Sequence, residues 1–154
     1  MSNSLRRSFF CVIPAVMLIG GCAPDDYDRD GVPPTARTTE SGAPSRPVQI
    51  GFDGPRFDAC AGFGRVTNLN PRGDNYLSVR GAPSGSAEEI DRLGPGRGVS
   101  MCQQVGNWIG VVYAPESETP VDCGVGSPVN SKRIYEGPCK SGWVSENFIE
   151  LVAG

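Results

Sequence analysis

Hydrophobic and polar residues alternate along several short stretches of the chain from about Cys60 onward. In "NYLSVR", the apolar Leu77 and Val79 alternate with Ser78 and Arg80, which is typical of a half-buried β-strand. Similar stretches are "GVSMCQQ", the longer apolar run "NWIGVVYA" and the terminal "GWVSENFIELV", and residues 66–69 are a candidate fifth strand. No stretch keeps a helical period beyond the short "SAEEIDRL", which fits a turn of helix or part of a loop. The pattern predicts a mostly β domain of about five strands.

The chain begins with a different pattern, in which a basic start precedes an apolar run. Arg6 and Arg7 are followed by the eleven-residue stretch Phe9–Ile19 and then by two glycines. A membrane-spanning helix needs about 20 apolar residues, so this run is too short to be one. The order of basic, apolar and small residues is that of a secretory signal, which we assign to residues 1–21. We therefore expect the protein to be exported.

Residues 22–58 are polar and rich in Pro, Asp, Ser and Thr, as in "APDDYDRDGVPPTARTTESGAPSRP". A segment with so few large apolar residues cannot offset the entropy of ordering, so we expect a disordered linker. Four aspartates, at positions 25, 26, 28 and 30, resemble part of a calcium loop. The carboxylate expected at the twelfth loop position is absent, and we therefore expect a solvated acidic cluster.

Composition and charge narrow the class of partner. The 21 Gly and 14 Pro make up almost a quarter of the 154 residues, against an ordinary share of about 12%. This favours turns and loops over long helices. The chain without its first 21 residues carries 12 basic and 17 acidic residues, a net charge of −5. An acidic domain is a poor match for a nucleic-acid backbone, so we expect no nucleic-acid partner.

The residues Ile19-Gly20-Gly21-Cys22 resemble a bacterial lipobox, at which a lipoprotein signal peptide is cut. The resemblance implies that the thiol of Cys22 is acylated and that the lipid anchors the chain to a membrane. Several acyl chains hold far more firmly than one, since each buried methylene contributes about 0.8 kcal/mol. Ala23, rather than an aspartate, follows the cysteine. In a Gram-negative envelope this implies the periplasmic side of the outer membrane. The alternative is an ordinary signal peptide cut near Ala23, with Cys22 discarded.

The order of the predicted strands resembles that of a bacterial SH3-like (SH3b) domain, which we place at residues 59–154. The family's "LNVRSGPS" element is similar to residues 77–84, "LSVRGAPS", and its final "GWVSSSYL" is similar to the stretch that begins "GWVS" at Gly142. Its two middle elements fall at residues 90–99 and 108–113. The resemblance implies a small SH3-like barrel that binds cell-wall peptidoglycan or its peptides.

An insertion at about residues 115–141 departs from the family, in which a short hairpin turn is usual. Cys123 and Cys139 lie near its two ends, and Cys60 and Cys102 complete an even set. In an exported protein four cysteines indicate two disulfides, for which three pairings are possible. We favour Cys123 with Cys139, which would staple the insertion, and Cys60 with Cys102. Zinc is the alternative for the four thiols, but no CxxC pair is present and the compartment is oxidising.

Candidate catalytic groups are few. The chain has no histidine, so neither a Ser-His-Asp nor a Cys-His arrangement can form. Acid pairs occur at residues 88–89 and 116–118, where we expect solvated surface. We therefore expect a protein that is not an enzyme, with no cofactor and no metal.

Two binding hypotheses remain. In the first, the SH3-like domain recognises peptidoglycan or a peptide through aromatic side chains beside polar loop residues. The candidate ligand-binding residues are Trp108, Trp143, Tyr113, Tyr76, Arg80, Asp74 and Asn75. Either tryptophan could instead pack in the core. In the second hypothesis, a structural or protein-interaction lipoprotein uses the insertion as its contact surface, with Lys132, Arg133, Ile134 and Tyr135.

Overall fold

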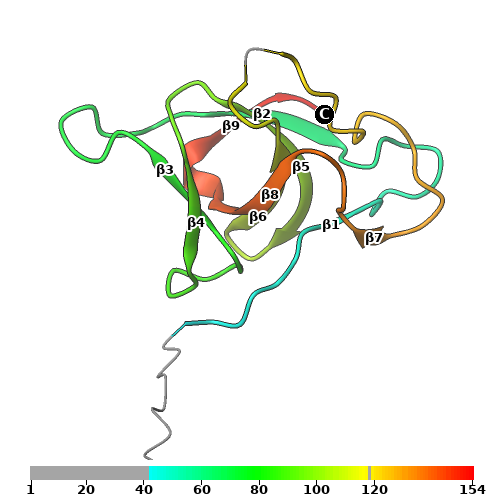
Figure 1. The fold of residues 1–154 in the computed structure, drawn as a ribbon, viewed down its shortest axis with the longest axis horizontal. Helices are drawn as coiled ribbons and strands as arrows, with labels where there is room; N and C mark the ends of the chain where they lie inside the picture. Colours follow the sequence, from blue (N-terminus) through cyan, green and yellow to red (C-terminus); the bar gives the residue numbers. More distant parts are fainter. Residues whose placement is uncertain (1–41, 118) are drawn as a thin grey trace, which may run out of the picture. The chain divides into compact units, whose positions relative to one another are not determined.

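The computed structural model describes residues 42–117 and 119–154, whose regular secondary structure is almost entirely β-strand, joined by long loops (Figure 1). Seven strands form one antiparallel sheet in the order β4-β3-β8-β6-β5-β2-β9. Their bounds are β2 Gly62–Val66, β3 Leu77–Arg80, β4 Glu89–Leu93, β5 Gly98–Val105, β6 Trp108–Tyr113, β8 Lys140–Ser145 and β9 Ile149–Ala153. A second sheet pairs β1, Gln49–Ile50, with β7, Arg133–Ile134. One 3₁₀ turn, η1 at Glu146–Phe148, leads into β9.

One face of the seven-stranded sheet closes around an inner core. Buried side chains from β2, β3, β4, β5, β6 and β8 form one cluster, and Ile149 of the edge strand β9 packs against it. Strands at both ends of the sheet can share a cluster only if the sheet is strongly curled. The end strands β4 and β9 are not paired with each other in the described residues, so the sheet is curled without being a closed barrel.

The other face of β5, β6 and β8 carries an outer core. Trp143 and Val112 on this face pack against Val48 and Ile50 from the segment before β2 and against Tyr135 from the insertion. We call the two segments that bury this face, residues 42–60 and the described residues of 114–139, the cover. They are joined to each other by the β1–β7 pair and by an isolated bridge between Asp58 and Pro128. The cover thus makes a second layer over part of the sheet.

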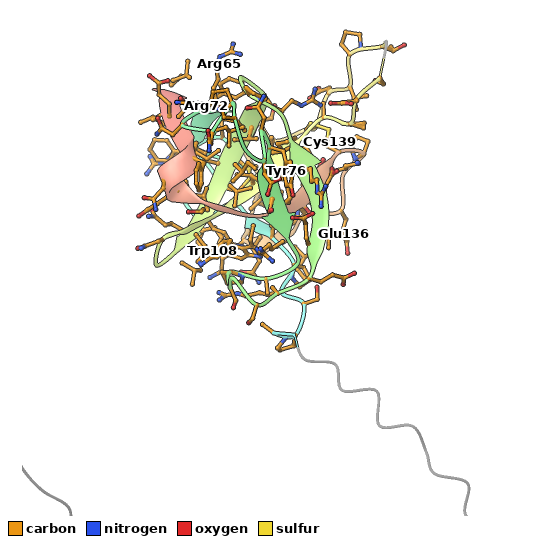
Figure 2. The ribbon with its side chains drawn as sticks, turned by 90° about the vertical axis from the view of Figure 1, so that its left-hand side faces the viewer. Arg65, Arg72, Tyr76, Trp108, Glu136 and Cys139 are labelled. Carbon is orange, nitrogen blue, oxygen red and sulfur yellow. A yellow bond between two sulfur atoms is a disulfide. The ribbon has the colours of Figure 1, made fainter. Side chains whose placement is uncertain are left out.

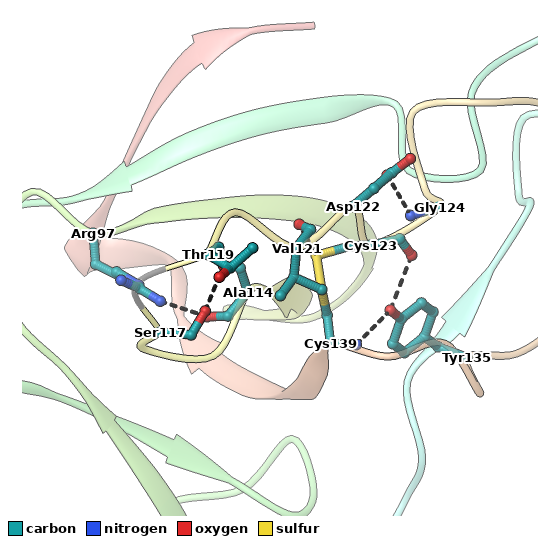
Figure 3. The surroundings of a disulfide bond; sticks show 10 residues. All are labelled: Arg97, Ala114, Ser117, Thr119, Val121, Asp122, Cys123, Gly124, Tyr135 and Cys139. Atoms are coloured by element: carbon teal, nitrogen blue, oxygen red, sulfur yellow. Dashed lines mark hydrogen bonds between the residues drawn. A yellow bond between two sulfur atoms is a disulfide. The ribbon is translucent and has the colours of Figure 1, made fainter.

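Two disulfides tie the cover to itself and to the sheet. The strand disulfide joins Cys60 to Cys102 of β5, and the insertion disulfide joins Cys123 to Cys139. Tyr135 supports the insertion disulfide, since its hydroxyl donates to the Cys123 carbonyl at 2.9 Å and accepts from the Cys139 backbone N–H at 3.1 Å (Figure 3). These are the pairs that the sequence favoured, and they exclude the four thiols as zinc ligands.

The mostly β fold is confirmed, with more strands than the sequence predicts. "SAEEIDRL" contains the edge strand β4, where a turn of helix or a loop was expected. The segment 42–58, predicted to be linker, includes Val48 and Ile50 with at most 2% of their surface exposed. The predicted boundary at residue 59 therefore lies inside the packed region. Cys22, the signal peptide and the earlier part of the linker lie outside the described residues, within which no helix is long and apolar enough to cross a membrane.

Candidate functional site

A groove opens where β3 and β8 separate. The two strands pair only at Arg80 and Trp143, and beyond that pair the gap between them holds a cavity of about 300 Å³. Figure 2 views the molecule from the side on which β3 and β4 lie in Figure 1, and it labels Tyr76 and Trp108. The groove is lined by Leu69, Asp74, Tyr76, Leu77, Ser78, Arg80, Gly85, Trp108, Ser145 and Phe148. Its lining comes from β3, the loops before and after it, η1 and the adjoining ends of β6 and β8.

Strand alternation explains the mixed chemistry of this groove. Leu77 and Val79 of β3 point to the inner core, which leaves Ser78 and Arg80 on the opposite face. Leu69 and Phe148 are partly buried against the same inner core and give the groove an apolar side. A ligand would therefore meet both apolar surface and hydrogen-bonding groups, as small-molecule and peptide sites generally require.

Four of the seven candidate residues meet in the groove, namely Asp74, Tyr76, Arg80 and Trp108. Trp108 is half-buried, because part of its ring packs against the outer core. The Arg80 guanidinium donates to the Ala87 carbonyl at 2.7 Å and so is held in place. Neither Asp74 nor Arg80 forms a salt bridge within the described ranges, which leaves one anion and one cation on the groove wall without an ion-pair partner.

The other three candidates lie elsewhere. Trp143 is fully buried in the outer core, and its Nε1–H donates to the Arg46 carbonyl of the cover at 2.7 Å. The prediction that Trp143 contacts a ligand at the surface is therefore wrong, and Trp143 instead packs in the core. Asn75 is exposed beside the groove without lining it. In the insertion, Tyr135 is likewise a core residue, whereas Lys132, Arg133 and Ile134 are exposed.

Tyr113, the third residue outside the groove, lines a separate cavity of about 300 Å³ between β4, the end of β6 and the start of β8. Its hydroxyl donates to Oδ2 of Asp91 at 3.0 Å, and Lys140 Nζ lies 2.9 Å from the same oxygen. Burial and the bond to Asp91 raise the pKa of Tyr113 well above its usual range. Partial burial works against ionisation of Asp91, but hydrogen bonds from Lys140, the Arg92 backbone and Tyr113 outweigh it and lower the pKa of that carboxyl. This arrangement fastens the edge strand β4 to β6 and β8.

Sequence reasoning missed a network behind the groove. Arg92 of β4 lies over the ring of Tyr76, with Cζ 4.2 Å from the ring centroid, and its Nε contacts Oε1 of Glu89 at 2.5 Å. Glu89 in turn accepts a hydrogen bond from the Ser78 hydroxyl. The only signal in the sequence was the alternation of Ser78 with Leu77 and Val79, because the partners lie on a strand that was not predicted.

In residues 42–117 and 119–154, no group of three or more His, Cys, Asp or Glu side chains is arranged to hold a metal ion. Comparisons with protein-family models, with curated proteins and with solved structures found nothing that matches this chain.

Proposed function

We propose that this chain is a non-catalytic envelope lipoprotein, anchored through Cys22, whose domain binds cell-wall peptidoglycan or its peptides in the groove between β3 and β8. The observation that carries the proposal is the meeting of Asp74, Tyr76, Arg80 and Trp108 around one cavity. These four are among the seven ligand-binding candidates selected from the sequence, and they come from two parts of the chain, residues 74–80 and the start of β6.

The chemistry of the groove favours a short peptide that carries both charges. The Arg80 guanidinium presents only hydrogen-bond donors and suits a carboxylate, while the carboxylate of Asp74 suits an ammonium group. The rings of Tyr76 and Trp108 provide apolar surface between polar contacts. Peptidoglycan peptides offer free carboxylates and amines, and a lipid-anchored domain would lie beside that polymer.

The proposal includes an SH3-like architecture for the domain. Its support is the small antiparallel sheet curled around one core, together with the order of the stretches similar to the family, which lie on β3, on β4 and the start of β5, on β6 and on β8. The absence of histidine from the whole sequence supports a non-catalytic role.

Sedimentation with insoluble peptidoglycan tests the binding. The lipid-free chain starting at Ala23, oxidised so that both disulfides form, is mixed with purified sacculi and centrifuged. We expect the wild type to sediment and Trp108→Ala to remain largely in solution. Phe57→Ala is the matched control, because Phe57 is an aromatic residue that is 61% exposed and does not line the groove. Wild-type protein that stays in the supernatant would refute the proposal.

The anchor is tested separately by metabolic labelling with a palmitate analogue. We expect label in the wild type and none in Cys22→Ala. Label that survives this substitution would refute Cys22 as the acylated residue.

A second candidate function, a protein-interaction lipoprotein that uses the insertion, is favoured by apolar exposure on the cover. Phe52, Phe57 and Ile134 are 45%, 61% and 45% exposed, and Lys132 Nζ lies 4.9 Å from the centroid of the Phe52 ring. Deleting the insertion would uncover Trp143, so a point change tests this surface better. Cross-linked partners that are lost in Ile134→Asp and retained in Trp108→Ala would favour this function over wall binding.

A further inference from the structure

The wall of the groove at Ser78 is backed by a carboxylate on the neighbouring strand. Ser78 of β3 pairs in register with Arg92 of β4, and Arg80 pairs with Glu89. The Ser78 hydroxyl crosses to Glu89 and donates to Oε2, while the other oxygen, Oε1, contacts Arg92 Nε at 2.5 Å. Both oxygens of Glu89 are thus engaged, one by the groove wall and one by the arginine that covers Tyr76.

The direction of the hydrogen bond follows from elementary chemistry. An ionised carboxylate can only accept, so the single proton of the serine hydroxyl must point at Glu89. The hydrogen bond from Ser78, followed by that from Arg92, lowers the pKa of Glu89 below its ordinary value of 4.5 and keeps it ionised at neutral pH. The charged groups that face this carboxyl are Arg92 on its own strand and Arg80 on β3. Only the lone pairs of Ser78 Oγ then remain for a molecule in the groove.

We propose that Glu89 sets the hydrogen-bond polarity of the groove, so that Ser78 accepts from an ammonium, amide N–H or hydroxyl of the ligand and disfavours a carbonyl or carboxylate oxygen. Arg80 lies two residues along the same strand, a Cα spacing of about 7 Å, and its guanidinium offers donors only. The wall therefore presents an acceptor and then a donor. It matches a peptide segment whose N–H or ammonium group lies about two residues from a carboxylate.

This inference rests on the proposed function, because it assumes that a peptide occupies the groove. A plain alternative is that Glu89 only stabilises the β3–β4 hairpin through Ser78 and Arg92. Glu89→Gln separates the two possibilities, since the amide keeps the shape and can donate to Ser78 Oγ, which frees the serine proton to turn toward the ligand. Removing the negative charge of Glu89 also favours anionic ligands through long-range electrostatics. This effect has to be measured without Ser78 and subtracted from the shift seen with Ser78 present.

The test uses two soluble probes of similar size. Alanyl-alanine amide has an ammonium group and no carboxylate, whereas N-acetyl-alanyl-alanine has a carboxylate and no ammonium group. Dissociation constants for both are measured by NMR titration of the lipid-free chain in the wild type, Glu89→Gln, Ser78→Ala and the double variant. The quantity compared is the preference for the first probe over the second. Well-dispersed amide spectra confirm that each variant is folded.

We expect Glu89→Gln to shift this preference toward the acetylated probe, and to do so more strongly when Ser78 is present than in the Ser78→Ala background. The two shifts should differ by about three- to tenfold, which is the size of effect expected from reversing one hydrogen bond. An equal shift in both backgrounds would mean that charge alone acts, and it would overturn the inference while leaving the groove as the binding site. Failure of the wild type to bind sacculi and both probes would instead overturn the proposed function, and this inference with it.

Discussion

Replacing Trp143 by alanine tests the division between core and groove, because the two tryptophans of this chain have opposite expected roles. Trp143 has no exposed surface and lies between β8 and the cover. Burying an aromatic side chain removes about 150–250 Å² from water, and a Trp→Ala change in a core costs about 3–5 kcal/mol. A domain of this size has a free energy of unfolding of about 5–15 kcal/mol, so the variant should be strongly destabilised but partly folded.

Trp143→Phe serves as the graded control. It keeps most of the ring volume and loses the Nε1–H that donates to the Arg46 carbonyl. Arg46 lies at the surface, where water can replace that donor, and the added cost of the lost hydrogen bond should be near the low end of about 0.5–1.5 kcal/mol.

Stability is measured by equilibrium unfolding in urea without reducing agent, so that both disulfides stay intact, and unfolding is followed by circular dichroism. Binding is measured separately, by sacculus sedimentation in the absence of urea. We expect Trp143→Ala to lower the unfolding midpoint far more than Trp108→Ala, and Trp108→Ala to lose binding with little loss of stability. Unchanged stability of Trp143→Ala together with lost sedimentation would refute the assignment of Trp143 to the core.

Three further predictions follow from the packing and the charges. Gly142→Ala should lower the free energy of unfolding by about 1–3 kcal/mol, because its new Cβ would lie 2.4 Å from Cγ1 of the buried Val79. Gly126→Ala is the control, since a Cβ at Gly126 would meet open space, and it should have little effect in the same urea assay. The pKa of Asp91 in the folded state is below its ordinary value of 3.8, so the ion pair with Lys140 stabilises the protein above about pH 4 and is lost as the pH falls below that value. Asp91→Asn should therefore flatten the fall in unfolding free energy at acid pH. An unchanged slope in this variant would contradict a stabilising role for the pair. Replacing both cysteines of the insertion disulfide by alanine should lower the free energy of unfolding by about 3 kcal/mol, and the same change at the strand disulfide should lower it by about 4 kcal/mol. The difference arises because the sequence separations of the two pairs are 16 and 42. Thermal melts that show the larger loss for the insertion disulfide would contradict this loop-length argument.

Local patterns in the sequence predicted the strands that have one apolar face. The alternation of Leu77 and Val79 with Ser78 and Arg80 predicted β3, in which Leu77 and Val79 are buried. The edge strand β4 escaped this reasoning. Ile90 is 48% exposed, so the two apolar residues of β4 do not follow the period-two burial that marks an inner strand.

Long-range packing explains the remaining differences. Val48 and Ile50 form too short a pattern to indicate a strand, and they are buried because they pack against Trp143 and Val112 of the sheet, nearly 100 and more than 60 residues later. Similarly, nothing in the residues next to Trp108 or Trp143 shows which of them the cover buries. The groove residues Asp74, Tyr76, Arg80 and Trp108 were found from residue type and loop position, but Phe148 and the partners of Ser78 required the tertiary arrangement.

The position of the strand disulfide also sets how the domain would respond to mechanical load. A pull on the chain before residue 42 reaches the domain through the hydrogen bonds of Arg46 and Val48, which can break one after another. Peeling would stop at Cys60, where the covalent bond to Cys102 transfers the force to the middle of the sheet. The 18 residues from 42 to 59 would release about 60 Å of extended chain before that limit. Under load the amino-terminal part of the cover would thus lengthen first, and the covalent bond to Cys102 would limit how far it can extend.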